Sequence, residues 1–334
     1  MGGFGRKPIV GARPIRLNST LTMFRRAQRS WVPLISLALG AGVGRVTTAS
    51  APSTVLEQIT HENRSDPSFS PDGRRMVVVS VIGGIEQLSL VSVDGRGATL
   101  LTADQPFDHE DPAWSPDGRS IAYVSLAGKG EVIHVMDADG QNDRPLTPAT
   151  QRSIHPSWSP DGRTLLYCTD DDLHPPKKND AEIYSVDAGT GGVRKIISGG
   201  VNTYPSYSPD GRRIVFRKMV GESNSEVFVA DADGSHEINL TQHPAFDGWP
   251  AWSPDGRQIA FASNREGNYQ IYIMNADGSD VRLLARSEGR GTAPKWTPDA
   301  SRIFFSICRS FQGVGRCEIF AAGVPVFTPT GPAI

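Results

Sequence analysis

The sequence has few cysteines, and none of them is spaced for a metal site. Only three occur in 334 residues, without a Cys/His pattern of the zinc-binding kind. Cys308 and Cys317 flank the turn-like stretch RSFQGVGR between two apolar runs, so we expect either a disulfide across a hairpin, which suits an oxidising compartment, or two free thiols. Cys168 lies inside TLLYCT and is interpreted as a small buried hydrophobe.

Basic residues are scarce outside the N-terminal segment. Residues 1–51 hold eight of the 34 Lys and Arg residues and none of the 36 acidic ones, which leaves 26 basic against 36 acidic residues in the rest of the chain. No Lys/Arg-rich run follows, so this acidic part has no basic segment that could bind the phosphate backbone of a nucleic acid. We therefore expect no nucleic-acid binding.

No apolar run reaches the ~20 residues that a membrane-spanning helix needs. The longest, about 13 residues from Trp31, follows three arginines and precedes the small residues ASA, as in a secretory signal peptide. We expect residues 1–51 to be an extension plus a signal peptide that starts at Met23. The mature protein would then be periplasmic or secreted, without a membrane span. An uncleaved anchor and an organelle transit peptide are the alternatives, because Pro52 follows the cut and the leader is rich in arginine.

One sequence motif, by contrast, is abundant. A stretch of the type aromatic-Ser-Pro-Asp-Gly-Arg occurs five times, and a degenerate copy, KWTPDASR, follows. The copies lie 44 to 49 residues apart, and a period of this length is typical of repeat architectures. The aspartates of the six copies are Asp72, Asp117, Asp161, Asp210, Asp255 and Asp299.

Each period contains four candidate strands. Ser-Pro-Asp-Gly is typical of a tight turn, because proline fixes φ and glycine permits a positive φ. The runs that follow, such as QIAFAS at 258–263 and QIYIMN at 270–275, are rich in β-forming residues, and a second turn of the ADGS type precedes a last short strand. Four strands in each of six repeats predict an all-β, six-bladed propeller.

The repeats also resemble a known family. SPDGRQIAFASNREGNYQIYIMNADGSDVRLL at 253–284 is similar to the WD-like repeat of TolB-type β-propellers, and the resemblance extends from about residue 54 to 322. It implies one domain, residues 52–334, built from four-stranded antiparallel blades. Only about fourteen residues separate Ala51 from the first repeat, so we expect no α/β domain of the kind that TolB carries ahead of its propeller.

The ends of the chain suggest how the ring closes. Residues 54–60 have the character of a fourth strand without a blade of their own, and we expect them to complete the last blade. Such closure removes open sheet edges. The alternative is that residues 324–328 supply the missing strand.

One aromatic position recurs in every repeat, two residues before the turn proline. Because the position is filled in each blade, we expect its ring to be buried between neighbouring sheets and not to form a stacking platform. The Asp-rich turns, such as DADG at 137–140, lack the further ligands of a calcium loop. The recurring aromatic residues are Phe69, Trp114, Trp158, Tyr207, Trp252 and Trp296.

Positions that differ between the repeats are better candidates for function, since variable segments on a rigid scaffold usually carry it. We expect the two kinds of tight turn to share one face of the disc and the other loops to share the opposite face. Just before each innermost strand stands a residue of different chemistry, and together these would form an acidic, polar and aromatic channel mouth. They are Asp66, Asp111, His155, Tyr204, Trp249 and Ala293, with His61, Asp108, His109, Glu110, Asn202 and Asp247 nearby and the excursion 170–180 beside them.

Two functions fit this pattern. The first is a monomeric, exported, non-enzymatic scaffold without a cofactor, which binds an envelope protein or peptide segment, or alternatively a glycan, at the channel mouth. In the resembled family, TolB binds a peptidoglycan-associated lipoprotein. The second is a metal-dependent polysaccharide lyase or hydrolase, whose ligands would come from His61, Asp66, Asp108, His109, Asp111 and His155. A serine-peptidase domain is not expected, because the chain has no G-x-S-x-G motif.

Overall fold

The computed structural model describes residues 55–325 except 104, 129, 170–179 and 312–313. The expected signal peptide, nearly all of the 170–180 excursion and most of the alternative closing segment 324–328 lie outside the described residues. Within the described part of the chain, no helix is long and apolar enough to cross a membrane.

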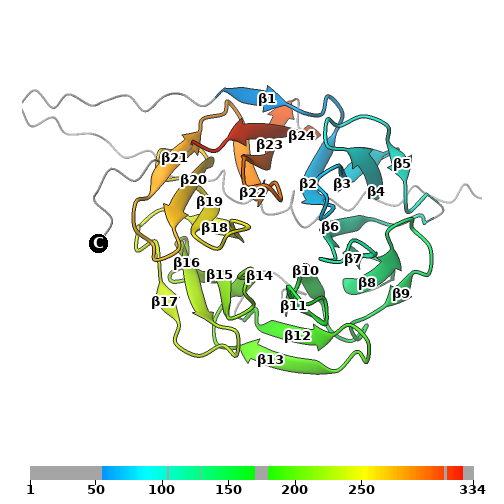
Figure 1. Cartoon of the computed structure of the whole chain (residues 1–334), viewed down its shortest axis with the longest axis horizontal. Helices are drawn as coiled ribbons and strands as arrows, with labels where there is room; N and C mark the ends of the chain where they lie inside the picture. Colours follow the sequence, from blue (N-terminus) through cyan, green and yellow to red (C-terminus); the bar gives the residue numbers. More distant parts are fainter. Residues whose placement is uncertain (1–54, 104, 129, 170–179, 312–313, 326–334) are drawn as a thin grey trace, which may run out of the picture. The chain divides into compact units, whose positions relative to one another are not determined.

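The described residues form 24 strands in six four-stranded antiparallel sheets, which are arranged as the blades of a ring (Figure 1). The innermost strands are β2 (Arg64–Phe69), β6 (His109–Trp114), β10 (Ser153–Trp158), β14 (Asn202–Tyr207), β18 (Asp247–Trp252) and β22 (Arg290–Trp296). The second strands are β3 (Arg75–Ile82), β7 (Ser120–Ser125), β11 (Thr164–Thr169), β15 (Arg213–Met219), β19 (Gln258–Ser263) and β23 (Arg302–Phe311). The third strands are β4 (Ile85–Ser92), β8 (Val132–Asp137), β12 (Ile183–Asp187), β16 (Ser225–Asp231), β20 (Gln270–Asn275) and β24 (Val314–Gly323). The outermost strands are β5 (Thr99–Leu100), β9 (Arg144–Pro145), β13 (Val193–Ile197), β17 (Ile238–Asn239), β21 (Arg282–Ala285) and β1 (Leu56–Gln58).

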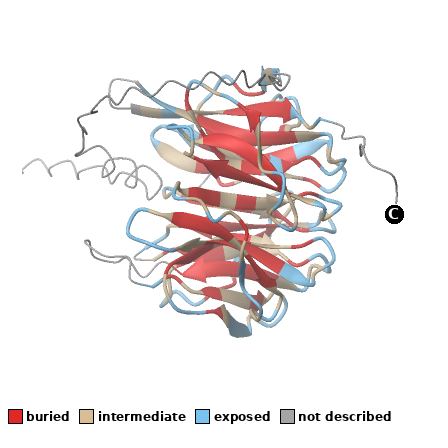
Figure 2. Cartoon of the chain, turned by 90° about the vertical axis from the view of Figure 1, so that its left-hand side faces the viewer, coloured by how far each residue is buried: buried red, intermediate tan, exposed pale blue. Residues whose placement is uncertain are grey.

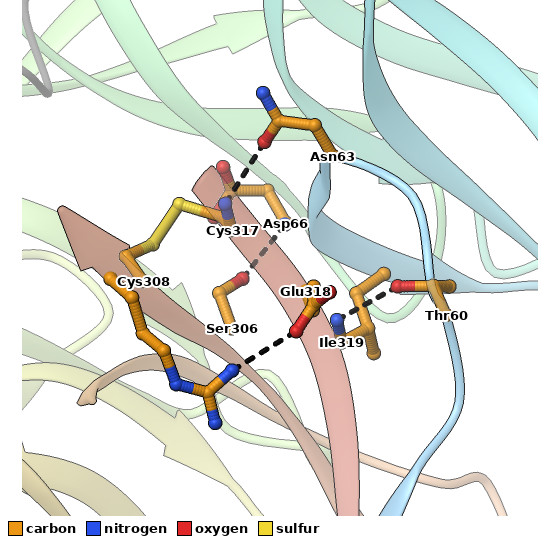
Figure 3. Close-up of a disulfide and its surroundings, with 9 residues drawn as sticks. Thr60, Asn63, Asp66, Ser306, Cys308, Cys317, Glu318 and Ile319 are labelled. Atoms are coloured by element: carbon orange, nitrogen blue, oxygen red, sulfur yellow. Dashed lines mark hydrogen bonds and ion pairs between the residues drawn. A yellow bond between two sulfur atoms is a disulfide. The ribbon is translucent and has the colours of Figure 1, made fainter. Parts of the chain in front are cut away.

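The first strand of the chain closes the ring, which confirms the prediction from the sequence. β1 pairs antiparallel with β24, with Leu56 opposite Ala322. The connection that follows is also tied to β24: the Ile59 N–H donates to the Ile319 carbonyl at 2.8 Å, and the Ile319 N–H donates to Thr60 Oγ1 at 2.9 Å (Figure 3). The last blade therefore combines both ends of the described chain.

The core consists of apolar layers between neighbouring blades, seen as buried segments along the sheets in Figure 2. The layer between the first two blades shows the pattern. Trp114 from β6 lies with Val77 and Leu88 of the first blade and with Ile121 and Tyr123 of its own blade. The other repeat aromatics lie against the corresponding layers, so each ring fills the junction with the blade before it.

The Ser-Pro-Asp-Gly turns form a second set of contacts around the ring. In the first turn, Asp72 Oδ1 accepts hydrogen bonds from Ser70 Oγ at 2.6 Å and from the Arg74 N–H at 3.1 Å. Gly73 follows with a φ of 66°, and a Cβ at this glycine would lie 3.6 Å from Cδ of Pro298 in the preceding turn. Successive turns therefore pack on one another, and we call the face that carries them the turn face and the opposite face the loop face.

The sixth turn departs from this pattern, and the departure predicts a stabilising substitution. Ala300 occupies the glycine position with a φ of 58°, in the left-handed region that costs a residue with a Cβ about 1–2 kcal/mol. Ala300→Gly is expected to raise the free energy of unfolding by about 0.5–1 kcal/mol, after the entropy that glycine adds to the unfolded chain is subtracted. Urea unfolding measures the change, and Gly256→Ala in the fifth turn should show the opposite sign. A loss of stability in Ala300→Gly would contradict this interpretation.

Blade six carries a long hairpin that is bridged by a disulfide. Cys308 of β23 and Cys317 of β24 are register partners, with their Cα atoms 4.1 Å apart and their sulfurs bonded (Figure 3). The Cys317 N–H also donates to Asn63 Oδ1 at 2.9 Å. The bridge thus lies where the hairpin of the last blade meets the connection into the first.

Candidate binding site in the central channel

The innermost strand of every blade contains a bulge, and the variable residues occupy it. These residues lie inside the strands, so the prediction that they stand just before them is wrong: Asp66, for example, is the third residue of β2, between the register positions Ser65 and Ser68. The following residue is a proline in all six strands, and since proline cannot donate to the ladder it is confined to edges and bulges. The proline therefore accounts for the interruption of the hydrogen-bond ladder between the innermost and second strands.

All six bulge residues have a positive φ although none is glycine. The values lie between 49° at Asp66 and 55° at His155 and Tyr204, in a region that residues with a Cβ rarely adopt. A bulge redirects a side chain, and strain of this kind persists only where the surrounding structure enforces it. Here the strain recurs at the innermost strands, which lie around the middle of the ring (Figure 1), and we call the region that the six bulge residues surround the central channel.

One side of the channel is acidic. Burial raises the pKa of Asp66, and burial together with the nearby charge of Asp66 raises the pKa of Asp111 to about 7. Lys295 from β22 lies within electrostatic range of both carboxylates. The Lys295 side chain is exposed, but the protein around its ammonium group solvates a positive charge poorly, which lowers the pKa of Lys295. The two carboxylates oppose this shift.

The other side is aromatic. His155 and Tyr204 have ring centroids 3.8 Å apart, and Tyr204 and Trp249 follow at 5.3 Å. We call these three residues the aromatic arc. The Arg217 guanidinium lies 5.1 Å from the centroid of Tyr204, in the range of a cation–π contact. The arc thus runs across the inner strands of three consecutive blades.

His155 joins the two sides. Its backbone N–H donates to Asp111 Oδ2 at 3.2 Å, and its Nε2 lies 3.6 Å from the same oxygen. On the other side of the ring, Nδ1 lies 3.2 Å from Sγ of Cys168, which is fully buried. Cys168, which the sequence analysis interpreted as a plain hydrophobe, therefore also contacts a channel residue.

His109 does not belong to this site, and its placement at the channel mouth is wrong. Its side chain is fully buried, with ring contacts to Phe107 at 5.6 Å and Tyr123 at 5.3 Å, and Tyr123 belongs to the layer between the first two blades. Burial lowers its pKa to about 4, so the imidazole is neutral near pH 7. His109 is therefore a core residue.

Most of the neighbouring polar candidates hold loops in place. Asp108 Oδ1 accepts from the Glu86 N–H at 2.8 Å, the Asn202 side chain donates to the Ala181 carbonyl at 3.2 Å, and buried Asp247 pairs with Arg265 at 3.0 Å. Among the residues that the structure describes, no three His, Cys, Asp or Glu side chains are grouped so that they could hold a metal ion. The six ligand candidates thus do not converge.

Lys295 is the main residue that the sequence analysis missed. A signal was present, because the residue two positions after each bulge is small in five repeats and a lysine only in the sixth. These residues are Ser68, Ala113, Ser157, Ser206, Ala251 and Lys295.

The raised pKa of Asp111 predicts a pH dependence of stability. Because the carboxyl has an ordinary pKa near 4 when unfolded and about 7 when folded, the native state binds more protons between these values, and stability falls as the pH rises through this window. Asp111→Asn resembles the protonated form and should remove this contribution. Urea unfolding from about pH 4 to about pH 8 should therefore show a steeper loss in the wild type than in Asp111→Asn. Parallel curves would show that Asp111 titrates normally.

The fold and the channel define a β-propeller whose repeated turns form the scaffold and whose bulges carry the variable chemistry. Residues 127–328 match the family model "TolB beta propeller domain", so the chain belongs to the TolB β-propeller family. This confirms the resemblance that the repeats indicate. No curated protein matches the chain in sequence.

Solved structures show the same fold at low identity. A putative TolB from Agrobacterium tumefaciens is 23% identical, with a TM-score of 0.60 over 81% of this chain and 97% of that one. TolB from Acinetobacter baumannii is 21% identical, with a TM-score of 0.58, and the match covers 78% of this chain and 63% of that one. An oligogalacturonate lyase from Vibrio parahaemolyticus is 16% identical, with a TM-score of 0.57 over 83% of this chain and 95% of that one. Proteins described as TolB and as a lyase thus share this fold, and the function has to be argued from the site.

Proposed function

We propose that this chain is an exported, monomeric, non-enzymatic scaffold of the cell envelope that binds a segment of another protein in its channel, entered from the loop face. The observation that carries the proposal is the position of Asp66 and Asp111 beside the aromatic arc. Carboxylates and aromatic faces both attract a cation, so this pair of features suits a lysine or arginine side chain. The proposed partner therefore presents a basic residue to the channel.

The site residues are accessible enough to be contacted. The Asp111 side chain keeps 24% of its surface exposed and that of His155 keeps 16%, whereas the Asp247 side chain nearby has none. Moreover, the nearby charge of Asp66 raises the pKa of Asp111, so an incoming cation would relieve an existing repulsion. Affinity would then come from charge neutralisation as well as from contact.

The proposed location follows from different features. A disulfide between Cys308 and Cys317 suits an oxidising compartment, and the arginine-rich leader has the pattern of an export signal. The similarity to TolB structures adds an analogy of fold. A metal-dependent lyase or hydrolase is not proposed as a second function, because the described residues provide no group of metal ligands.

The proposal is tested by capture from an envelope extract. The immobilised wild type is compared with a variant that combines Asp111→Asn, His155→Ala and Trp249→Ala. A matched control carries Asp277→Asn and His236→Ala, which lie at exposed turns between the third and outermost strands of their blades and not on an innermost strand. We expect the wild type and the control to retain the same protein and the channel variant to lose it.

Competition identifies the recognised group. A short peptide with one central arginine should displace the captured protein, and the same peptide with citrulline, which is neutral, should not. Recovery of the same protein by the channel variant would refute the proposed site. Displacement by a neutral oligosaccharide but not by the arginine peptide would replace the protein segment with a glycan.

A further inference from the structure

The residues closer to the turn face differ in chemistry from the bulge residues. Two positions beyond the bulges, five blades place a serine or alanine, and the sixth places Lys295. Small residues leave space at this level of the channel, and Lys295 is the one long, charged side chain in the set. The position two residues after the bulge is thus small and uncharged in five blades and positively charged in the sixth.

A cavity opens at this level. It has a volume of about 310 Å³ and is lined from the turn face by the prolines of four of the repeated turns and by aromatic residues that include Tyr207, Trp252 and Trp296. Ser68 and Ser206 contribute hydroxyls, and Lys295 is the only charged residue among the described residues that line the space. The cavity walls therefore mix proline and aromatic side chains with serines, Ser208 and Ser253 included, and carry a positive charge at one point.

The Lys295 ammonium is free to take a ligand. Among the residues described in the structure, none forms a hydrogen bond or an ion pair within 4 Å with it, although Asp66 and Asp111 act on it at longer range. The protein around Lys295 solvates its ammonium poorly, so a charge-assisted hydrogen bond to an anion would stabilise the charged form. The opposite ends of the channel thus favour ligand groups of opposite charge.

We propose that the turn-face cavity binds the free carboxylate at the C-terminus of a polypeptide with an apolar last residue. Lys295 would pair with the carboxylate, and the proline and aromatic walls would cover the last side chain. The volume lies at the lower end of the about 300–1,000 Å³ typical of small-ligand sites, so it suits the end of a chain and not a folded element. Capture of a C-terminal carboxylate is an established mode of peptide recognition, and a lysine can donate a charge-assisted hydrogen bond to such a group.

The two channel carboxylates give the proposal a second, independent signature. Asp66 and Asp111 act on Lys295 and would also act, with the opposite sign, on a bound carboxylate. Removing one negative charge should therefore strengthen binding at the turn face, whereas it should weaken binding of a basic segment at the loop face. The proposal for the turn-face site and the proposal for the loop-face site can therefore be refuted independently of each other.

The test is calorimetric titration with N-acetyl-Ala-Phe, whose C-terminus is free, and with its C-terminal amide as the matched neutral probe. We expect the wild type to bind the acid and not the amide. Lys295→Ser introduces the residue that other repeats already carry, so the fold should be kept, and it should weaken binding of the acid at least about tenfold. Lys295→Arg should retain binding, Lys195→Ser on outer strand β13 should have no effect, and Asp66→Asn should strengthen binding.

Three results would overturn the proposal. Equal binding of the acid and the amide, or unchanged binding in Lys295→Ser, would show that no carboxylate pairs with Lys295. Equal binding of 3-phenylpropionate, which has the acid and the ring but no peptide group, would overturn the assignment to a chain end. Thermal unfolding of Lys295→Ser provides the folding control.

Discussion

Replacing Trp114 with alanine is expected to lower the free energy of unfolding by about 3–5 kcal/mol, the usual range for truncating a large buried aromatic side chain. Only 7% of Trp114 is exposed, and its ring lies between residues of the first two blades. The Arg75 guanidinium, 5.3 Å from the ring centroid, loses a cation–π contact as well. Equilibrium unfolding in urea measures the change.

The size of the loss in unfolding free energy shows whether the Trp114 ring packs in the core or binds a ligand. Trp114→Phe keeps a ring in the layer and should cost less than Trp114→Ala. Both variants, studied well below their unfolding temperatures, should bind the envelope partner as the wild type does, since the ring faces the neighbouring blade. A loss of less than about 1 kcal/mol in Trp114→Ala, together with lost binding, would instead make the repeat aromatics a ligand platform.

Removing the closing strand is expected to have a similarly large effect. A chain that begins at His61 lacks β1, the buried side chain of Ile59 and the hydrogen bonds that Ile59 and Thr60 exchange with Ile319. Losing a large buried aliphatic side chain and two or more backbone hydrogen bonds should cost at least about 4 kcal/mol. The outer edge of β24 would also be exposed, which favours association between chains.

The control for this truncation is a chain that begins at Val55 and so keeps β1. Urea unfolding and light scattering should show a stable monomer for the longer chain and a destabilised, self-associating one for the shorter. Equal stability of the two chains would show that β1 does not hold the ring closed.

The sequence was sufficient to predict the architecture because each blade repeats the same local signals. Pro, Asp and Gly of the turns have direct backbone roles, and the ring at the aromatic position has one packing role, so six copies identify six blades. Closure could be predicted because residues 54–60 have strand character without a blade of their own. These are properties of short segments, which a single sequence displays.

The site could be predicted only in part, because it depends on contacts between repeats. The bulges were missed, since a proline after a polar residue is compatible with a strand that starts one residue later. His109 was assigned to the channel because it lies two residues before Asp111, and such residues share a face in a regular strand. The bulge between Glu110 and Ala113 interrupts this alternation, and the ring of His109 is in the core. The approach of Cys168 to His155 joins two strands and could not be read from either.

Lys295 was missed for a different reason. It lies in the most degenerate repeat, where a departure from the pattern is easily taken for loss of the motif. Aligning the six repeats on the bulge proline shows that the position is otherwise Ser or Ala, so the lysine is a specific difference. In a ring of nearly equivalent blades, such single differences are the residues that can distinguish one ligand from another.

The most direct test of the central claim, that the partner binds in the channel beside the aromatic arc, is site-specific photo-crosslinking from three tyrosine positions. A photoreactive phenylalanine analogue replaces Tyr204 in the channel, Tyr207 on the turn face or Tyr184 on third strand β12, and the proteins are irradiated in an envelope extract. We predict that the partner captured by the wild type is crosslinked from position 204 and not from 184 or 207. Crosslinking of that partner from 184 or 207, with none from 204, would contradict the account.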